Sequence, residues 1–236
     1  MMDVPLITSA LALADLILSS ANVIIAFSLL AYFITHSLRS SVARAFIALL
    51  AFMTIVYVGD VIIANVVTAW AVLPWLRFQW LGIAFVPAAY LQFSDALLRN
   101  TGAASPARRR MVMVAYVSGL AFCALAVFTD LLVRDGVVSE WISYLKPGPL
   151  FWMFAIYFTL ITLSGMRNIA RARRRCLTST SRRRMMYLGL ASAAPALGVF
   201  PYLLLMFTES GPFTLNWIYV FSVLGNMGVA LMTVVM

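Results

Sequence analysis

Residues 6–35 read LITSALALADLILSSANVIIAFSLLAYFIT, and this stretch decides the class of the protein. It holds a single charged residue, Asp15, and no lysine or arginine occurs before Arg39. A helix needs about 20 consecutive apolar residues to cross the roughly 30 Å hydrocarbon core of a bilayer. A cleavable signal peptide begins with basic residues and has a shorter apolar core, so we interpret this stretch as a retained transmembrane helix.

The composition of the whole chain agrees with this interpretation. Hydrophobic residues make up 64% of the 236 residues and charged residues 11%, whereas soluble domains are about half apolar and about a quarter charged. A soluble domain of this length has too little interior to bury so much apolar surface. Lipid leaves open backbone groups without partners, and the alternating pattern of a membrane barrel is missing, so we expect helices.

The sequence predicts an all-α polytopic membrane protein, with residues 1–236 forming a single domain of seven transmembrane helices. We expect these helices at residues 6–35, 45–68, 75–98, 111–133, 149–170, 185–207 and 213–236. Pro74 is expected to break the chain between the second and third of them, because proline cannot donate a backbone hydrogen bond. Three further prolines are predicted kink points: Pro87, Pro195 and Pro201.

The basic residues predict the orientation. Fourteen of the 17 lysines and arginines fall on one side of the predicted spans, mainly in residues 99–110 and 171–184, and Arg77, Arg134 and Lys146 fall on the other. Cytoplasmic loops are enriched in lysine and arginine. We therefore expect the N-terminus outside, the C-terminus in the cytoplasm, and a location in a bacterial inner membrane.

The basic loops also indicate partners. Each basic run is short and lacks interleaved aromatic residues, so we expect contacts with anionic lipid headgroups and not with nucleic acid. Gly189 and Gly198 suit close helix packing, either within the bundle or in a homodimer.

A group of polar residues is predicted near the outer ends of the helices. Asp60 lies inside the second span, and a carboxylate in a membrane helix is costly unless it faces the bundle interior or water. Arg77 is the nearest candidate counter-charge, and Trp80, Trp152 and Asn216 complete a predicted pocket for a small ligand of unknown identity. The alternative is a buried ion pair that fixes helix packing. Other polar residues at this depth are Asp15, Asn65 and Gln79.

The remaining chemistry-bearing residues favour structural roles. Asp95 and Arg99 are four residues apart on one predicted helix, which is the spacing of a local ion pair. His36 is the only histidine, so ligation of haem by two histidines is excluded. The only lysine, Lys146, lies in an outer loop, where it cannot serve a helix-bound retinal. With no Walker, GxSxG or HExxH motif, we expect no cofactor, no metal site and no catalytic activity.

Two stretches carry a family resemblance. Residues 78–102 read FQWLGIAFVPAAYLQFSDALLRNTG and residues 146–161 read KPGPLFWMFAIYFTLI. They resemble the N-terminal seven-helix region of certain bacterial sensor histidine kinases. In place of the acidic residue that this family often has before Leu-Gly, the chain has Gln79 and Trp80. The matching positions are Trp80, Leu81, Gly82, Pro87, Phe93, Thr101 and Gly102, and then Gly148, Pro149, Leu150, Phe151, Trp152 and Tyr157.

The resemblance implies a sensory input module. In such proteins a ligand or a membrane state acts on the bundle, and the seventh helix passes the signal to a PAS, kinase or diguanylate cyclase domain, none of which lies within these 236 residues. Two alternatives stay open: a transporter or channel, and a non-catalytic structural subunit of a larger membrane complex. A membrane enzyme acting on lipids is the least favoured, because no catalytic set is found on one helix face.

Overall fold

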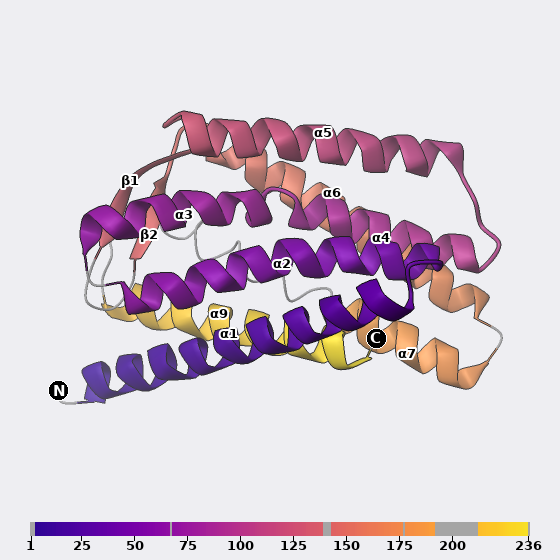
Figure 1. The fold of residues 1–236 in the computed structure, drawn as a ribbon, viewed down its shortest axis with the longest axis horizontal. Helices are drawn as coiled ribbons and strands as arrows, with labels where there is room; N and C mark the ends of the chain where they lie inside the picture. Colours follow the sequence, from indigo (N-terminus) through magenta and orange to yellow (C-terminus); the bar gives the residue numbers. More distant parts are fainter. Residues whose placement is uncertain (1–2, 67, 139–142, 177, 192–211, 236) are drawn as a thin grey trace.

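The computed structural model describes residues 3–66, 68–138, 143–176, 178–191 and 212–235 (Figure 1). Long helices lie side by side along one direction, and a small two-stranded sheet lies at one end of the bundle. The helices and strands are α1 (Asp3–His36), α2 (Ser41–Asn65), α3 (Ala69–Ile83), α4 (Val86–Asn100), α5 (Pro106–Phe128), β1 (Val133–Val138), β2 (Ser143–Pro147), α6 (Phe151–Arg175), α7 (Ser179–Ala191) and α9 (Pro212–Val235).

Five segments of the described chain are long and apolar enough to cross a membrane. They correspond to α1, α2, α3 with α4, α5 and α6, and α9 contains a shorter apolar stretch, Tyr219–Leu231. Several large apolar side chains on these helices point outward, and Val117 and Phe128 are 64% and 82% exposed. Lipid is as apolar as such side chains, so helices in a bilayer can carry them on their outer faces. The chain is a multi-pass membrane protein.

The direction of the helices agrees with the predicted topology. The chain passes along the bundle in alternating directions from α1 to α6 (Figure 1). α9 runs beside α1 in the same direction, because Asp15 contacts Ser222 and the later residue Asn22 contacts Asn226. α6 also shares the direction of α1. Most of the sixth predicted span, at residues 185–207, lies outside the described residues, and this span stays a prediction.

The third predicted span consists of two helices with a break between them. α3 ends at Ile83 and α4 begins at Val86, with Pro87 in its first turn. Proline has no backbone N–H and clashes with the preceding turn, so the predicted kink at Pro87 is confirmed. The predicted break at Pro74 is wrong, because this residue lies inside α3. Membrane bundles tolerate such prolines when neighbouring groups satisfy the freed carbonyl. Pro195 and Pro201 lie outside the described residues.

The segment after α5, in which the sequence predicted an outer loop around Lys146, forms a β-hairpin. β1 and β2 pair in antiparallel fashion, with Val133 opposite Pro147 and Val138 opposite Ser143. The register shifts between Arg134 and Gly136. This irregularity explains the error, because the Asp-Gly pair that interrupts the apolar residues is typical of a turn.

Most of the core lies in two apolar clusters, and a smaller third one consists of Ala88, Leu91, Ala115 and Ile161. The first lies among α1, α2, α4 and α9, and its fully buried Phe46 and Phe93 have ring centroids 5.4 Å apart. The second joins α3, the hairpin, α5 and α6 around Trp80, Phe151 and Phe154. The first cluster therefore packs α9 against the N-terminal half of the chain, and the second anchors the hairpin.

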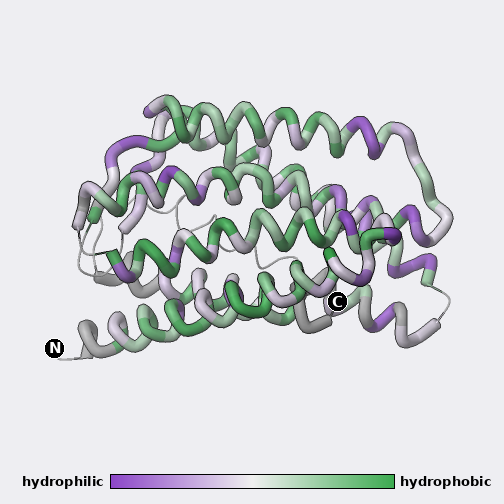
Figure 2. The backbone as a smooth tube through the Cα atoms, in the orientation of Figure 1, coloured by the Kyte–Doolittle hydropathy of each residue, from purple (hydrophilic) through white to green (hydrophobic). Residues whose placement is uncertain are grey.

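Polar residues separate along the bundle. Figure 2 shows that the middle parts of the helices are mainly apolar. Hydrophilic segments are concentrated where α1 joins α2, α4 joins α5 and α6 joins α7. We call this end the basic end, because residues 39, 99–110 and 171–184 lie there. The opposite end, which carries the hairpin and the start of α1, is called the hairpin end. This separation places the predicted basic loops together at one end of the molecule.

Candidate functional site

The carboxylate of Asp60 on α2 is hydrogen-bonded to the side-chain amide of Gln79 on α3. Gln79 Nε2 donates to Asp60 Oδ1 at 2.5 Å and to the Val56 carbonyl at 3.0 Å. Two glycines allow this close approach: Gly59 lies against the Gln79 side chain, and a Cβ on Gly82 would lie 2.5 Å from the Phe52 carbonyl oxygen. Gln79 thus links the two helices through one carboxylate and one backbone carbonyl.

A second polar group joins α1 to α9. Asp15 Oδ1 accepts hydrogen bonds from Ser222 Oγ at 2.7 Å and from Asn226 Nδ2 at 2.8 Å. Asn226 Nδ2 also lies 3.1 Å from Ser19 Oγ. Asn22 Nδ2 donates to the Asn226 side-chain oxygen at 3.3 Å and to its carbonyl at 3.1 Å. Ser19, Asn22 and Asn226 are buried, so these bonds lie within the helix interface.

Tyr57 connects the two groups. Its buried phenol hydrogen-bonds with Asn22 and lies near the carboxyl groups of both Asp15 and Asp60. One polar cluster therefore spans four helices. It consists of Asp15, Ser19 and Asn22 on α1, Tyr57 and Asp60 on α2, Gln79 on α3, and Ser222 and Asn226 on α9.

The carboxyl groups of the polar cluster have neutral partners. Among the described residues, the ion pairs are Arg77–Asp130, Arg99–Asp95 and Arg108–Asp95, and neither Asp15 nor Asp60 takes part. Polar groups within a membrane bundle are tolerated when hydrogen bonds satisfy them. Two of the donors to Asp15 come from α9. The hydrogen bonding of this carboxyl group therefore depends on the position of α9.

The predicted pairing of Arg77 with Asp60 is wrong. Arg77 Nη2 lies 2.6 Å from Asp130 Oδ1, and Nη1 donates to the Val127 carbonyl at 3.0 Å. Both side chains are partly exposed, at 35% and 71%. The guanidinium therefore ties α3 to the end of α5, and the partner of Asp60 is Gln79, two residues after Arg77 on α3.

The two tryptophans of the predicted pocket have other surroundings than the polar cluster. Trp80 is buried in the second apolar cluster, with its ring centroid 5.0 Å from that of Phe154. Trp152 is 53% exposed on α6. Asn216 belongs to α9, but its side chain lies outside the described part of the chain. Of the four predicted residues whose side chains are described, only Asp60 has contacts that place it in the polar cluster.

Sequence reasoning missed most members of the polar cluster. Asp15, Ser19 and Asn22 follow one another at spacings of four and three, and Ser222 and Asn226 are four apart. These spacings place each set on one face of its helix. A polar stripe in an otherwise apolar span therefore indicates which face of the helix points into the bundle. No sequence pattern indicated that the two stripes meet.

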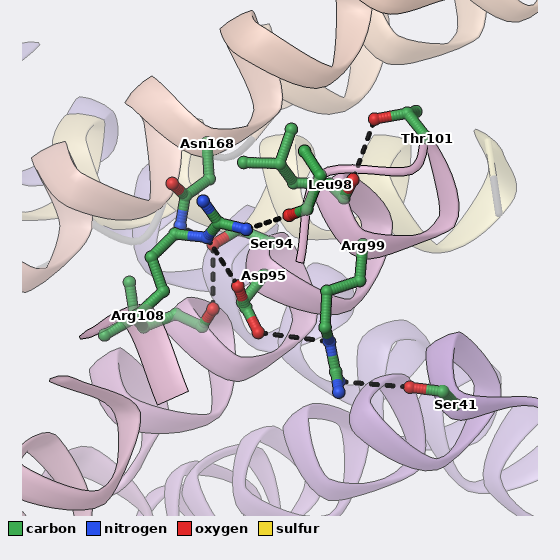
Figure 3. Close-up of polar contacts among 10 residues, drawn as sticks. Ser41, Ser94, Asp95, Leu98, Arg99, Thr101, Arg108 and Asn168 are labelled. Carbon is green, nitrogen blue, oxygen red and sulfur yellow. Dashed lines mark hydrogen bonds and ion pairs between the residues drawn. The ribbon is translucent and has the colours of Figure 1, made fainter. Parts of the chain in front are cut away.

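Asp95 anchors a second polar region, at the basic end (Figure 3). Its carboxylate lies 3.2 Å from Arg99 Nε and 2.8 Å from Arg108 Nε. Arg99 Nη2 also lies 3.1 Å from Ser41 Oγ. The predicted Asp95–Arg99 pair is confirmed, and Arg108 is an additional partner from α5. A single buried carboxylate thus pairs with two arginines and joins the starts of α2 and α5 to α4.

Further polar contacts make α4 the centre of the bundle. Asn168 Nδ2 of α6 donates to Ser94 Oγ at 3.3 Å, and Tyr116 of α5 donates to Gln92 Oε1 at 2.5 Å. α4 therefore has side-chain bonds to both neighbouring spans. These contacts hold α5 and α6 without involving α9.

The described residues hold no group of three His, Cys, Asp or Glu side chains that could bind a metal ion. His36 is exposed at the end of α1 and stacks on Tyr32, with ring centroids 4.8 Å apart. His36 therefore lies at the basic end, in the last turn of α1.

Comparison with known proteins adds a family to these observations. Residues 18–235 match the family described as the N-terminal 7TM region of histidine kinase. The comparison with curated proteins found no match. The family match covers most of the chain, from the middle of α1 to the end of α9. The chain therefore belongs to the family of N-terminal seven-transmembrane regions of histidine kinases.

Proposed function

We propose that the chain is the sensory input module of a bacterial signalling protein and that α9 carries the signal to an output domain or partner. The observation that carries this proposal is the set of hydrogen bonds from Asp15, Ser19 and Asn22 to α9. α9 is the last described element of the chain, and the residues that match the family extend to its end. A stimulus that changes the polar cluster would change the position of α9.

The physical basis is a two-state equilibrium. A ligand or membrane state shifts such an equilibrium only by its differential affinity for the two states. The two states would differ in the hydrogen bonds of the polar cluster, because a movement of α9 along α1 exchanges the partners of Asp15 and Asn22. Of the residues predicted to bind a ligand, we retain Asp60, because it lies near Tyr57, whose hydrogen-bond partner Asn22 contacts α9.

We further propose that the basic end faces the cytoplasm of a bacterial inner membrane and that the N-terminus lies outside. The concentration of arginines at the end where α1 joins α2, α4 joins α5 and α6 joins α7 supports this orientation. Lysine and arginine determine topology when they lie in short loops close to the ends of the spans. α9 would then leave the membrane on the cytoplasmic side, where kinase, PAS or cyclase domains work.

A fusion of residue 236 to a histidine kinase output domain tests the proposal. We expect Asn226→Leu to change kinase output, because it removes the side-chain partner of Asp15, Ser19 and Asn22. The matched control is Asn65→Leu, because Asn65 is exposed and bonds only within its own helix, to the Val61 carbonyl. Equal output from both folded variants and the parent would contradict the proposal.

Two measurements distinguish the alternatives. Solute or ion flux through the purified chain in liposomes would favour a transporter or channel. Stable subunits that co-purify after mild detergent extraction would favour a structural role in a larger complex. The sensor proposal predicts no flux and a kinase output that depends on Asn226.

A further inference from the structure

The arginines at the basic end differ in their partners. Arg99 and Arg108 both bind Asp95, whose side chain is 6% exposed. Their charge is therefore partly neutralised within the protein. The arginines near the turn between α6 and α7 lack such a carboxylate. Residues 167–187 contain eight arginines and no aspartate or glutamate.

We call one exposed set the α6–α7 arginine cluster. Within the described part of the chain, its side chains form no ion pair. Like charges gathered in this way repel one another unless anions lie between them. The members are Arg171, Arg173, Arg174 and Arg175 at the end of α6, and Arg182 and Arg183 in α7.

The position of the α6–α7 arginine cluster along the helices identifies the anion. A helix needs about 20 residues to cross the hydrocarbon core, so a span that begins at Phe151 reaches the headgroup region near residue 170. The four arginines at the end of α6 follow at once. On α7, Arg182 and Arg183 precede the apolar residues that start at Met185. Both arginine runs therefore lie at the level of lipid headgroups, beside a short turn.

α7 connects this surface to the helix proposed to carry the signal. It packs against α6 on one side and against α9 on the other. Figure 1 shows α7 close to the C-terminal end of α9. An anion held by Arg182 or Arg183 would therefore act on the helix that contacts α9.

We propose that the α6–α7 arginine cluster is a binding surface for anionic phospholipid headgroups, and that headgroups bound there bias the position of α9. The binding part stands on the charge and position of the cluster, whereas the effect on α9 rests on the proposed function. Anionic lipids attract arginines near the membrane surface. The lipid composition of the membrane would thereby become one input to the module.

Lipid exchange in nanodiscs tests the binding. The intact 236-residue chain is placed in nanodiscs of phosphatidylcholine and phosphatidylglycerol, and the lipids that co-purify with it are quantified by native mass spectrometry. We expect the triple variant R173Q/R174Q/R182Q to lower the preference for phosphatidylglycerol by roughly tenfold to hundredfold, since each arginine near the surface contributes a substantial attraction. The matched control, R39Q/R109Q/R110Q, removes three exposed arginines from the same end and should keep the preference.

An equal loss in both triple variants would overturn the proposed surface, because the attraction would then belong to the whole basic end. Tighter binding of a soluble phosphorylated peptide in pure phosphatidylcholine discs, with no preference for phosphatidylglycerol, would also overturn it and indicate a protein partner. Inorganic phosphate at millimolar concentration serves as the probe for free anions. We expect it to leave the lipid preference unchanged.

A distance measurement tests the effect on α9 separately. Spin labels replace Tyr187 on α7 and Leu231 on α9, both exposed, in a background with Cys123 and Cys176 changed to serine. We expect phosphatidylglycerol to shift the distance distribution in the parent and not in R173Q/R174Q/R182Q. An unchanged distance despite lipid binding overturns the effect on α9. If lipid binds and the distance distribution shifts, but kinase output does not change, the proposed function alone is contradicted.

Discussion

Asn22 and Asn226 are 204 residues apart in the sequence, yet the Asn22 amide donates to both the side-chain oxygen and the backbone carbonyl of Asn226. The backbone carbonyl of a helix is normally engaged by its own helix. The hydrogen bonds of this α1 side chain therefore depend on the position of α9 along α1, because a shift of one residue would break them. This contact joins the first and last described helices of the bundle.

The first prediction concerns the stability of this contact. Asn226→Leu removes three side-chain hydrogen bonds, to Asp15, Ser19 and Asn22. Hydrogen bonds between membrane helices contribute about 0.6 kcal/mol each on average. We expect the free energy of unfolding in detergent or bicelles to fall by about 2 kcal/mol. Asn65→Leu should change it by far less, and an equal effect of the two substitutions would contradict the account of the α1–α9 interface.

The second prediction ranks the two arginines that share Asp95. The Arg108 side chain is 19% exposed and the Arg99 side chain is 44% exposed. Water screens the more exposed pair, which therefore contributes less. We expect Arg108→Gln to lower the free energy of unfolding by about 1.5–3 kcal/mol, as for a hydrogen bond to a charged group, and Arg99→Gln to have a smaller effect. Chemical unfolding of both variants provides the test, and the reverse order would refute the roles assigned here.

The third prediction separates the two polar contacts of α3. Arg77→Gln breaks an ion pair whose partners are 35% and 71% exposed, and exposed pairs contribute about 0–1 kcal/mol. Gln79→Leu removes the donor to Asp60 and to the Val56 carbonyl, and an unsatisfied buried polar group costs about 1–3 kcal/mol. Thermal unfolding should therefore show the larger loss for Gln79→Leu. A larger loss for Arg77→Gln would favour the pairing with Asp60 that the sequence suggested.

The fourth prediction concerns the glycine contact between α2 and α3. A Cβ on Gly82 would lie 2.5 Å from the Phe52 carbonyl oxygen and close to Val56. Backbone cannot move aside as a flexible side chain can, so Gly82→Ala should separate the helices and cost about 1–3 kcal/mol. Ala124→Val adds more volume on the exposed face of α5 and serves as the control. A neutral Gly82→Ala would show that the two helices lie farther apart than described.

The sequence predicted features that depend on neighbours along the chain. Asp95 and Arg99 pair because residues four apart lie on one helix face, and the break at Pro87 follows from the chemistry of a single residue. The apolar spans and the basic end also follow from composition and charge. Each of these features needs no knowledge of which helix packs against which.

The errors arose where the partner lies far away in the sequence. Arg77 and Asp60 share a depth in the bilayer, but helix rotation directs Arg77 toward Asp130 and gives Gln79 to Asp60. Depth alone cannot determine rotation about a helix axis. For the same reason the polar stripe of α1 was visible in the sequence, whereas its pairing with α9 was not.

The distance between α1 and α9 at the basic end tests the central claim most directly. Spin labels at Ile34 and Leu231, both exposed, report this distance in nanodiscs by pulsed electron paramagnetic resonance. The proposed role of the polar cluster predicts that Asn226→Leu shifts or broadens the distance distribution, whereas Asn65→Leu leaves it as in the parent. An unchanged distribution in a folded Asn226→Leu variant would contradict the claim that the polar cluster sets the position of α9.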